Sequence, residues 1–260
     1  MRIIGVIDLL SNRAVHARAG DRARYQPLES VAGSSIEPGN AMALADIYIN
    51  GLGLSELYVA DLDAILGAAA ADRRTNAEAR QAGLVRRLVA LGVPLWLDAG
   101  IRSIDQARQA IQPGVAHLIV GLETLSSFEA LDTMCSTLDA ARIAFSLDLK
   151  DGEPIRTPDG ARLPEAIAAR AAGAGAAAVI VLDLARVGTG SGPDFNLIVR
   201  IRQAIPNTLL LAGGGVRSYE DVVRLADSGC DGALVATALH NSRLTAAGVI
   251  AAKRLGARSI

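Results

Sequence analysis

The chain has 260 residues, 51% of them hydrophobic, which is enough to bury the core of one large α/β domain. Its formal net charge is only -1, and its basic residues do not gather with aromatic residues, so we expect no nucleic-acid partner. The two cysteines, Cys135 and Cys230, lie far apart without a histidine cluster, so we expect neither a disulfide framework nor a metal site.

Short apolar runs alternate with helical patterns in the first half of the chain. Continuous apolar runs of this length are typical of buried parallel strands. We expect such strands at residues 2–8, 54–63, 94–102 and 117–124. Helical patterns follow them at residues 38–50, 75–91, 104–111 and 127–140.

The polar segment 11–38 is longer than a short barrel connection requires, so we interpret it as a lid over a site or as a disordered strip. The first residues lack the basic segment of a leader peptide, and no apolar run reaches the length of a membrane span. We therefore expect a cytoplasmic protein with no membrane partner.

The second half of the chain repeats the motifs of the first half. Four motifs recur in the same order, with the first copy given before the second: Asp8 and Asp148, Asp61 and Asp183, residues 98–102 and 213–217, and Val120 and Val235. Two copies of a four-strand, four-helix unit predict a single-domain (β/α)8 TIM barrel, with half-barrels of about residues 1–140 and 141–260. An open doubly wound sheet is the alternative, but no Gly-x-Gly-x-x-Gly motif follows the first strand.

Carboxylates end several of the predicted strands, and the carboxyl ends of all strands in such a barrel meet on one rim. Asp8 and Asp148 end otherwise apolar runs, where an ionisable group is costly without a function, so we interpret them as catalytic. Asp61 and Asp183 fit a substrate contact and the anchoring of a loop through backbone N–H groups equally well.

Three consecutive glycines, Gly213, Gly214 and Gly215, end the apolar run near the C-terminus. Glycine has no Cβ, so backbone N–H groups at this turn can approach an oxyanion closely. The next apolar run, a strand expected at 234–239, places Ala236 and Thr237 beside the turn. Together they predict a phosphate clamp between the last two strands. The glycines within 188–193 predict a loop that closes over a substrate.

The order and spacing of these motifs resemble the HisA/HisF family over nearly the whole chain, including residues 19–21, 60–63 and 100–102. Within that family the chain is more similar to the isomerase branch, which acts on a ribonucleotide bisphosphate. The resemblance implies an Amadori-type aldose–ketose rearrangement with Asp8 as general base and Asp148 as general acid. It implies neither a metal nor an organic cofactor.

The family's two phosphate-binding turns, one in each half, imply further substrate contacts. They add Gly100 and Gly121 to the candidates, and His16 stands where the family usually places an arginine. The expected partner is a phosphorylated small molecule, and the expected assembly is a monomer or a weak homo-oligomer.

Several positions depart from the family pattern. Asp98 occupies the first glycine position of the first-half turn and brings a like-charge penalty of about 1 kcal/mol or more to an oxyanion there. Leu182 stands in place of a threonine, and Ala236-Thr237 in place of a Gly-Arg pair. The departures indicate a paralogue that keeps one phosphate site, and such paralogues are associated with methanopterin and methanofuran coenzyme pathways.

Two further alternatives stay open. A lyase or synthase that forms a Schiff base needs a lysine, and Lys150 lies two residues beyond Asp148. A non-catalytic phosphate-binding barrel would keep the glycine turn but would not depend on Asp8.

Overall fold

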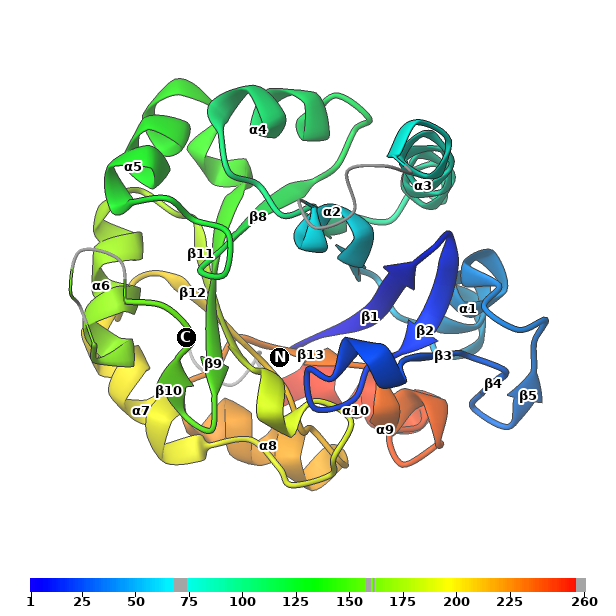
Figure 1. Cartoon of the computed structure of the whole chain (residues 1–260). Helices are drawn as coiled ribbons and strands as arrows, with labels where there is room; N and C mark the ends of the chain where they lie inside the picture. The colour runs from blue at the N-terminus through cyan, green and yellow to red at the C-terminus, as the bar shows by residue number, and fades with distance from the viewer. Residues whose placement is uncertain (68–73, 158–159, 161, 256–260) are drawn as a thin grey trace.

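The computed structural model describes residues 1–67, 74–157, 160 and 162–255. Eight parallel strands form a closed sheet, because the last strand pairs with the first. In the order in which they pair, they are β1 Arg2–Leu10, β6 Leu57–Asp61, β7 Leu95–Asp98, β8 His117–Gly121, β9 Ile143–Lys150, β11 Ala178–Asp183, β12 Leu209–Gly213 and β13 Gly232–Val235. The predicted (β/α)8 TIM barrel is confirmed (Figure 1). Its origin by copying one half stays a prediction.

Helices follow the strands and surround the barrel (Figure 1). They are α1 Ala41–Asp46, α2 Leu62–Leu66, α3 Arg74–Val89, α4 Ile104–Ile111, α5 Phe128–Thr137, α6 Pro164–Gly173, α7 Phe195–Ala204, α8 Tyr219–Asp227, α9 Thr237–His240 and α10 Ala246–Leu255. Side-chain caps begin several of them: Ser103 accepts from the Gln106 N–H at α4, and Asp194 accepts from the Leu197 N–H at α7. None of the described helices is both long and apolar enough to cross a membrane.

Alternate residues of each strand point into the barrel, and the others point toward the helices. In β1, Ile3 and Ile7 belong to the outer core between sheet and helices, whereas Ile4 belongs to an inner core with Trp96 and Leu211. Later inward positions on the same strands reach the carboxyl-terminal rim. An ionisable side chain at one of these last inward positions therefore faces the mouth of the barrel.

The segment 11–38 is regular rather than a disordered strip. It contains β2 Arg13–His16, β3 Gln26–Pro27, β4 Ser30–Val31 and β5 Ser34–Ser35, and a 3-10 turn at Arg22–Arg24. Strand β2 pairs antiparallel with the end of β1, with Asp8 opposite Val15, so the segment extends the barrel wall beyond its rim.

The strand expected at 234–239 was wrong beyond Val235. Strand β13 ends there, and Thr237–His240 forms helix α9 after a turn at Ala236. An apolar run of six residues fits either structure, so periodicity alone could not separate them. The helix expected at 38–50 is present as α1 followed by a π-helical turn at Ile47–Gly51.

Candidate functional site

A cavity of about 240 Å³ opens at the carboxyl-terminal rim of the barrel. Residues from nearly every strand end line it, including Asp8 of β1, Asp148 of β9 and the turn after β12. The rim is where (β/α)8 barrels place their active sites. The cavity is therefore the candidate site.

Strand parity explains why three aspartates share this cavity. Asp8 follows the inward residues Ile4 and Val6 at two-residue steps, so its side chain points into the barrel. Asp98 and Asp148 lie at the corresponding inward positions of β7 and β9 and also line the cavity. The site thus joins the two predicted catalytic aspartates with Asp98.

Burial and mutual repulsion make these carboxyl groups weak acids. Burial raises the pKa of Asp8 to about 7, the Asp98 charge adds to the rise, and Arg22 opposes it. The pKa of Asp148 also rises to about 7 through burial and the Asp98 charge. Burial raises the pKa of Asp98 itself to about 6. Near neutral pH the group therefore holds both protonated and ionised carboxyls.

The aspartates differ in their hydrogen bonds. Asp148 accepts from Ser146 Oγ at 2.6 Å and from the Glu123 N–H at 3.1 Å, which favours its ionised form. Asp98 accepts from the Gly100 N–H at 3.1 Å and from the Tyr58 hydroxyl at 3.3 Å. Within the described part of the chain, no group donates a hydrogen bond to the Asp8 carboxylate, so its ionised form lacks the stabilisation that Asp148 receives.

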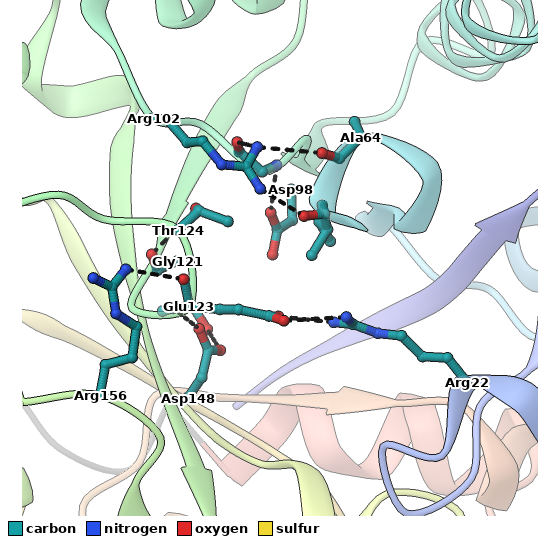
Figure 2. A network of polar contacts seen from close by, with 12 residues as sticks. Arg22, Ala64, Asp98, Arg102, Gly121, Glu123, Thr124, Asp148 and Arg156 are labelled. Atoms are coloured by element: carbon teal, nitrogen blue, oxygen red, sulfur yellow. Dashed lines mark hydrogen bonds and ion pairs between the residues drawn. The ribbon is translucent and has the colours of Figure 1, made fainter. Parts of the chain in front are cut away.

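An ion pair spans the mouth of the cavity next to these carboxylates. Arg22, from the turn after β2, binds both oxygens of Glu123 at 3.1 and 2.7 Å. Figure 2 shows this pair reaching between the two sides of the site, with Asp98 and Asp148 on either side of Glu123. Arg156 donates to the Glu123 carbonyl at 3.2 Å and so fixes the backbone of the same turn.

The opposite side of the cavity is built from glycine. Gly214 and Gly215 line the cavity with φ of +89° and +82°, where a side chain is strained. A Cβ on Gly214 would lie 2.5 Å from the Asp183 carbonyl oxygen. Among the described residues, the N–H groups of Gly214 and Gly215 have no protein acceptor. They are backbone donors available to a ligand.

The segment after β13 completes this side. Ala236 and Thr237 line the cavity, as predicted from the sequence. His16 does not line it, but its Nε2 atom lies 3.1 Å from Thr237 Oγ1, so His16 orients that hydroxyl. Burial lowers the pKa of His16, which favours its neutral form.

Two other predicted site residues, Asp61 and Asp183, lie outside the cavity and bind loop backbone. Asp61 and Asp183 are outward residues of β6 and β11 and do not line the cavity. Asp61 accepts from the Ala64 N–H and Gln81, and Asp183 accepts from the Asp151 and Gly152 N–H groups. Their carboxylates hold loops in place.

The remaining candidate glycines differ in whether they line the cavity, and the candidate lysine lies outside it. Gly121 lines the cavity, and a Cβ there would lie 3.2 Å from Asp148 Oδ2. Gly100 lines a second, more open cavity on the outer side of β7, and Gly213 lies at the end of β12 without lining either. Lys150 is exposed and outside the cavity, and the second lysine, Lys253, binds the Gly53 carbonyl.

Sequence reasoning missed several cavity residues. Tyr58, Glu123 and Arg22 line the site but were not among the candidates. Tyr58 occupies an inward position of β6, so strand parity was the signal that could have found it, whereas Glu123 lies in the turn after β8. Arg22 lies in the long segment after β1, where no periodicity places a side chain. Within the described residues, His, Cys, Asp and Glu side chains form no group of three or more that could hold a metal ion.

The barrel with a carboxylate-lined cavity at its rim defines the class of this protein. A family model described as "histidine biosynthesis protein" matches residues 2–245, so the chain belongs to that family. A relative from Thermus thermophilus, 32% identical over 248 residues, covers 94% of this chain and 96% of its own length. Its name is 1-(5-phosphoribosyl)-5-((5-phosphoribosylamino)methylideneamino) imidazole-4-carboxamide isomerase.

Two further relatives span the barrel. A protein of the same name from Dehalococcoides mccartyi is 30% identical over 253 residues, covering 94% of this chain and 96% of its own. An uncharacterized protein from Methanocaldococcus jannaschii is 29% identical over 245 residues, covering 94% and 95%. The name of the isomerases contains two phosphoribosyl groups.

Proposed function

We propose that this protein is an aldose–ketose isomerase that acts on a phosphorylated aminosugar and uses Asp8 and Asp148 as its acid–base pair. The observation that carries the proposal is the placement of both aspartates in one rim cavity with pKa values of about 7. Proton transfer is most efficient when the pKa of the transferring group lies near the working pH. The isomerase names of the relatives agree with this chemistry.

The two aspartates suit different steps of an Amadori-type rearrangement. The rearrangement begins when an acid protonates the ring oxygen of the sugar and opens the ring. Asp148 suits this step, because Ser146 and the Glu123 N–H stabilise the carboxylate that remains after proton loss. Asp8 suits removal of the C2 proton, because burial makes it a stronger base than an ordinary aspartate.

The glycine side of the cavity supports binding of a phosphate. Gly214 and Gly215, whose N–H groups have no acceptor among the described residues, line the same cavity as the aspartates, and Thr237 adds a hydroxyl held by His16. A phosphate anchored here would fix the sugar between Asp8 and Asp148.

The experiment that tests the proposal is an isomerisation assay with the purified protein. The substrates are the one named for the relatives and a set of aminoaldose monophosphates, with product formation followed by NMR. Asp8→Asn and Asp148→Asn should each lower turnover about 10²- to 10⁴-fold while phosphate binding persists. Full activity of Asp8→Asn would contradict the acid–base pair and favour a non-catalytic phosphate-binding barrel.

A second candidate is a HisA-like paralogue with a substrate other than that of the named isomerases. The observation in its favour is Asp98, whose carboxylate lines the cavity. A relative of similar identity from Methanocaldococcus jannaschii carries no isomerase name, which is compatible with this candidate. The Schiff-base version gains no support, because both lysines of the chain lie outside the cavity.

A further inference from the structure

We propose that Asp98 restricts the substrate to a single phosphate: the Gly214–Gly215 turn binds that phosphate, and Asp98 rejects an oxyanion at the ends of β7 and β8. This inference rests on the proposed function, since it names the substrate class of the same cavity. It sets this protein apart from the relatives whose substrate name contains two phosphoribosyl groups.

Carboxylates already accept from two of the backbone N–H groups at the ends of β7 and β8. The Gly100 N–H, which corresponds in sequence to that of Gly215, donates to Asp98 Oδ1 at 3.1 Å. The Glu123 N–H donates to Asp148 Oδ2 at 3.1 Å. A phosphate at this end would have to displace both carboxylates to reach the N–H groups. The Gly215 N–H, the counterpart of the Gly100 N–H, has no acceptor among the described residues, and neither has the adjacent Gly214 N–H.

The charges at this end also oppose a second phosphate. Asp98, Glu123 and Asp148 bring three carboxyl groups to adjacent strand ends, all lining the cavity. The nearby arginines are already engaged: Arg22 binds Glu123 through both nitrogens, and Arg156 donates to the Glu123 and Leu125 carbonyl oxygens. An added oxyanion would meet like charges in a partly desolvated space, where their repulsion is much stronger than in water.

Asp98 is the residue that distinguishes the end of β7 from the end of β12. It occupies the last inward position of β7, and Gly213 occupies the last position of β12, where a Cβ would lie 3.0 Å from Leu182. The change from hydrogen to a carboxymethyl group fills the anion position with a negative charge. One side chain therefore sets the number of phosphates that the cavity accepts.

The test compares two probes, ribose 5-phosphate and ribulose 1,5-bisphosphate, by isothermal titration calorimetry. The wild-type protein should bind both with similar affinity, because only one phosphate is held. Asp98→Gly, and the double variant Asp98→Gly with Ala99→Gly, which restores three glycines, should bind the bisphosphate about tenfold tighter than wild type, corresponding to about 1.4 kcal/mol. Their affinity for ribose 5-phosphate should not change.

Asp98→Asn serves as the matched control. It removes the charge but keeps an oxygen that can accept from the Gly100 N–H, so its gain for the bisphosphate should be smaller than that of Asp98→Gly. Thermal unfolding of each variant establishes that it is folded, and ribose 5-phosphate binding establishes that its glycine turn is intact.

The outcomes separate this inference from the proposed function. A wild-type protein that already binds the bisphosphate at least about tenfold tighter than the monophosphate would overturn the inference and leave the isomerase proposal standing. An Asp98→Gly variant that is folded but gains nothing would overturn it as well. A wild-type protein that binds neither probe would contradict the phosphate site on which both proposals depend.

Discussion

The turns after β7 and β12 have the same framework and opposite chemistry. Each carries a glycine with positive φ, Gly100 at +60° and Gly215 at +82°. After each, an arginine N–H donates to a side chain four residues later, Arg102 to Gln106 at 2.8 Å and Arg217 to Asp221 at 3.0 Å. Yet one turn directs a carboxylate into the cavity, and the other presents backbone donors to it.

This difference shows how little sequence is needed to change a binding site on a fixed scaffold. The backbone framework of the turn survives, because it depends on glycine and on the helix that follows. What changes is the inward residue that ends the strand. The result is a cavity with an acidic side, at β1, β7, β8 and β9, and a glycine side, at β12 and β13.

The largest expected effect lies on the acidic side. Asp8→Asn should lower kcat about 10²- to 10⁴-fold, because the amide cannot remove a proton. Asp61→Asn is the matched control: it also ends a strand, but it faces outward, and asparagine can still cap α2. Steady-state kinetics measures kcat for both variants. An equal loss of kcat in Asp61→Asn would contradict the assignment of the catalytic role to the inward-facing Asp8.

On the glycine side, Gly214→Ala should raise KM about tenfold to a hundredfold while kcat changes less. The new Cβ would contact the Asp183 carbonyl and shift the turn, which loses a hydrogen bond to a charged group, worth about 1.5–3 kcal/mol. Gly33→Ala has a similar φ cost at +81° but open space around it, so its KM should stay at the wild-type value. A rise of KM in both variants would point to general destabilisation rather than to the turn.

The buried aspartates should also make stability depend on pH. The pKa of Asp8 is about 7 in the folded protein and near 4 when unfolded, so its contribution is full below pH 4 and is lost as pH rises to 7. The free energy of unfolding of Asp8→Asn, relative to that of wild type, should therefore increase by about 2 kcal/mol when the pH is raised from 5 to 8. Urea unfolding at both pH values measures the gain. Parallel losses in the two proteins would show that Asp8 titrates normally.

The smallest expected effect sharpens the role of Asp98. Its negative charge raises the pKa of both Asp8 and Asp148. Asp98→Asn should therefore move both limbs of the bell-shaped pH profile of kcat/KM to lower pH, by about 0.5–1 unit. A purely structural role for Asp98 predicts a lower maximum at an unchanged optimal pH.

Much of this architecture was predictable from the sequence, because the barrel rule places all strand ends on one rim. The apolar runs located the strands, and Asp8, Asp148, Gly214 and Gly215 line the cavity, whereas Gly213 does not. The parity of Asp61 and Asp183 was also readable, since each lies one residue beyond an inward position of its strand. Counting in steps of two from the core would have assigned them to loop anchoring.

Other features depend on contacts that no local pattern encodes. The pairing of Arg22 with Glu123 joins residues 101 positions apart through the chain segment after β1. The helix at Thr237–His240 forms where the chain leaves the rim, although its Ala-Leu pair continues the apolar pattern of the strand before it. The occupation of the Gly100 N–H by Asp98 required the side-chain geometry of the folded turn.

The most direct test of the two-sided cavity is a crystal of the wild-type protein soaked in phosphate at pH 8. The account predicts one phosphate ion, within hydrogen-bonding distance of the Gly214 and Gly215 N–H groups, and Asp98 still bound to the Gly100 N–H. A phosphate at the ends of β7 and β8, with Asp98 displaced, would contradict the account.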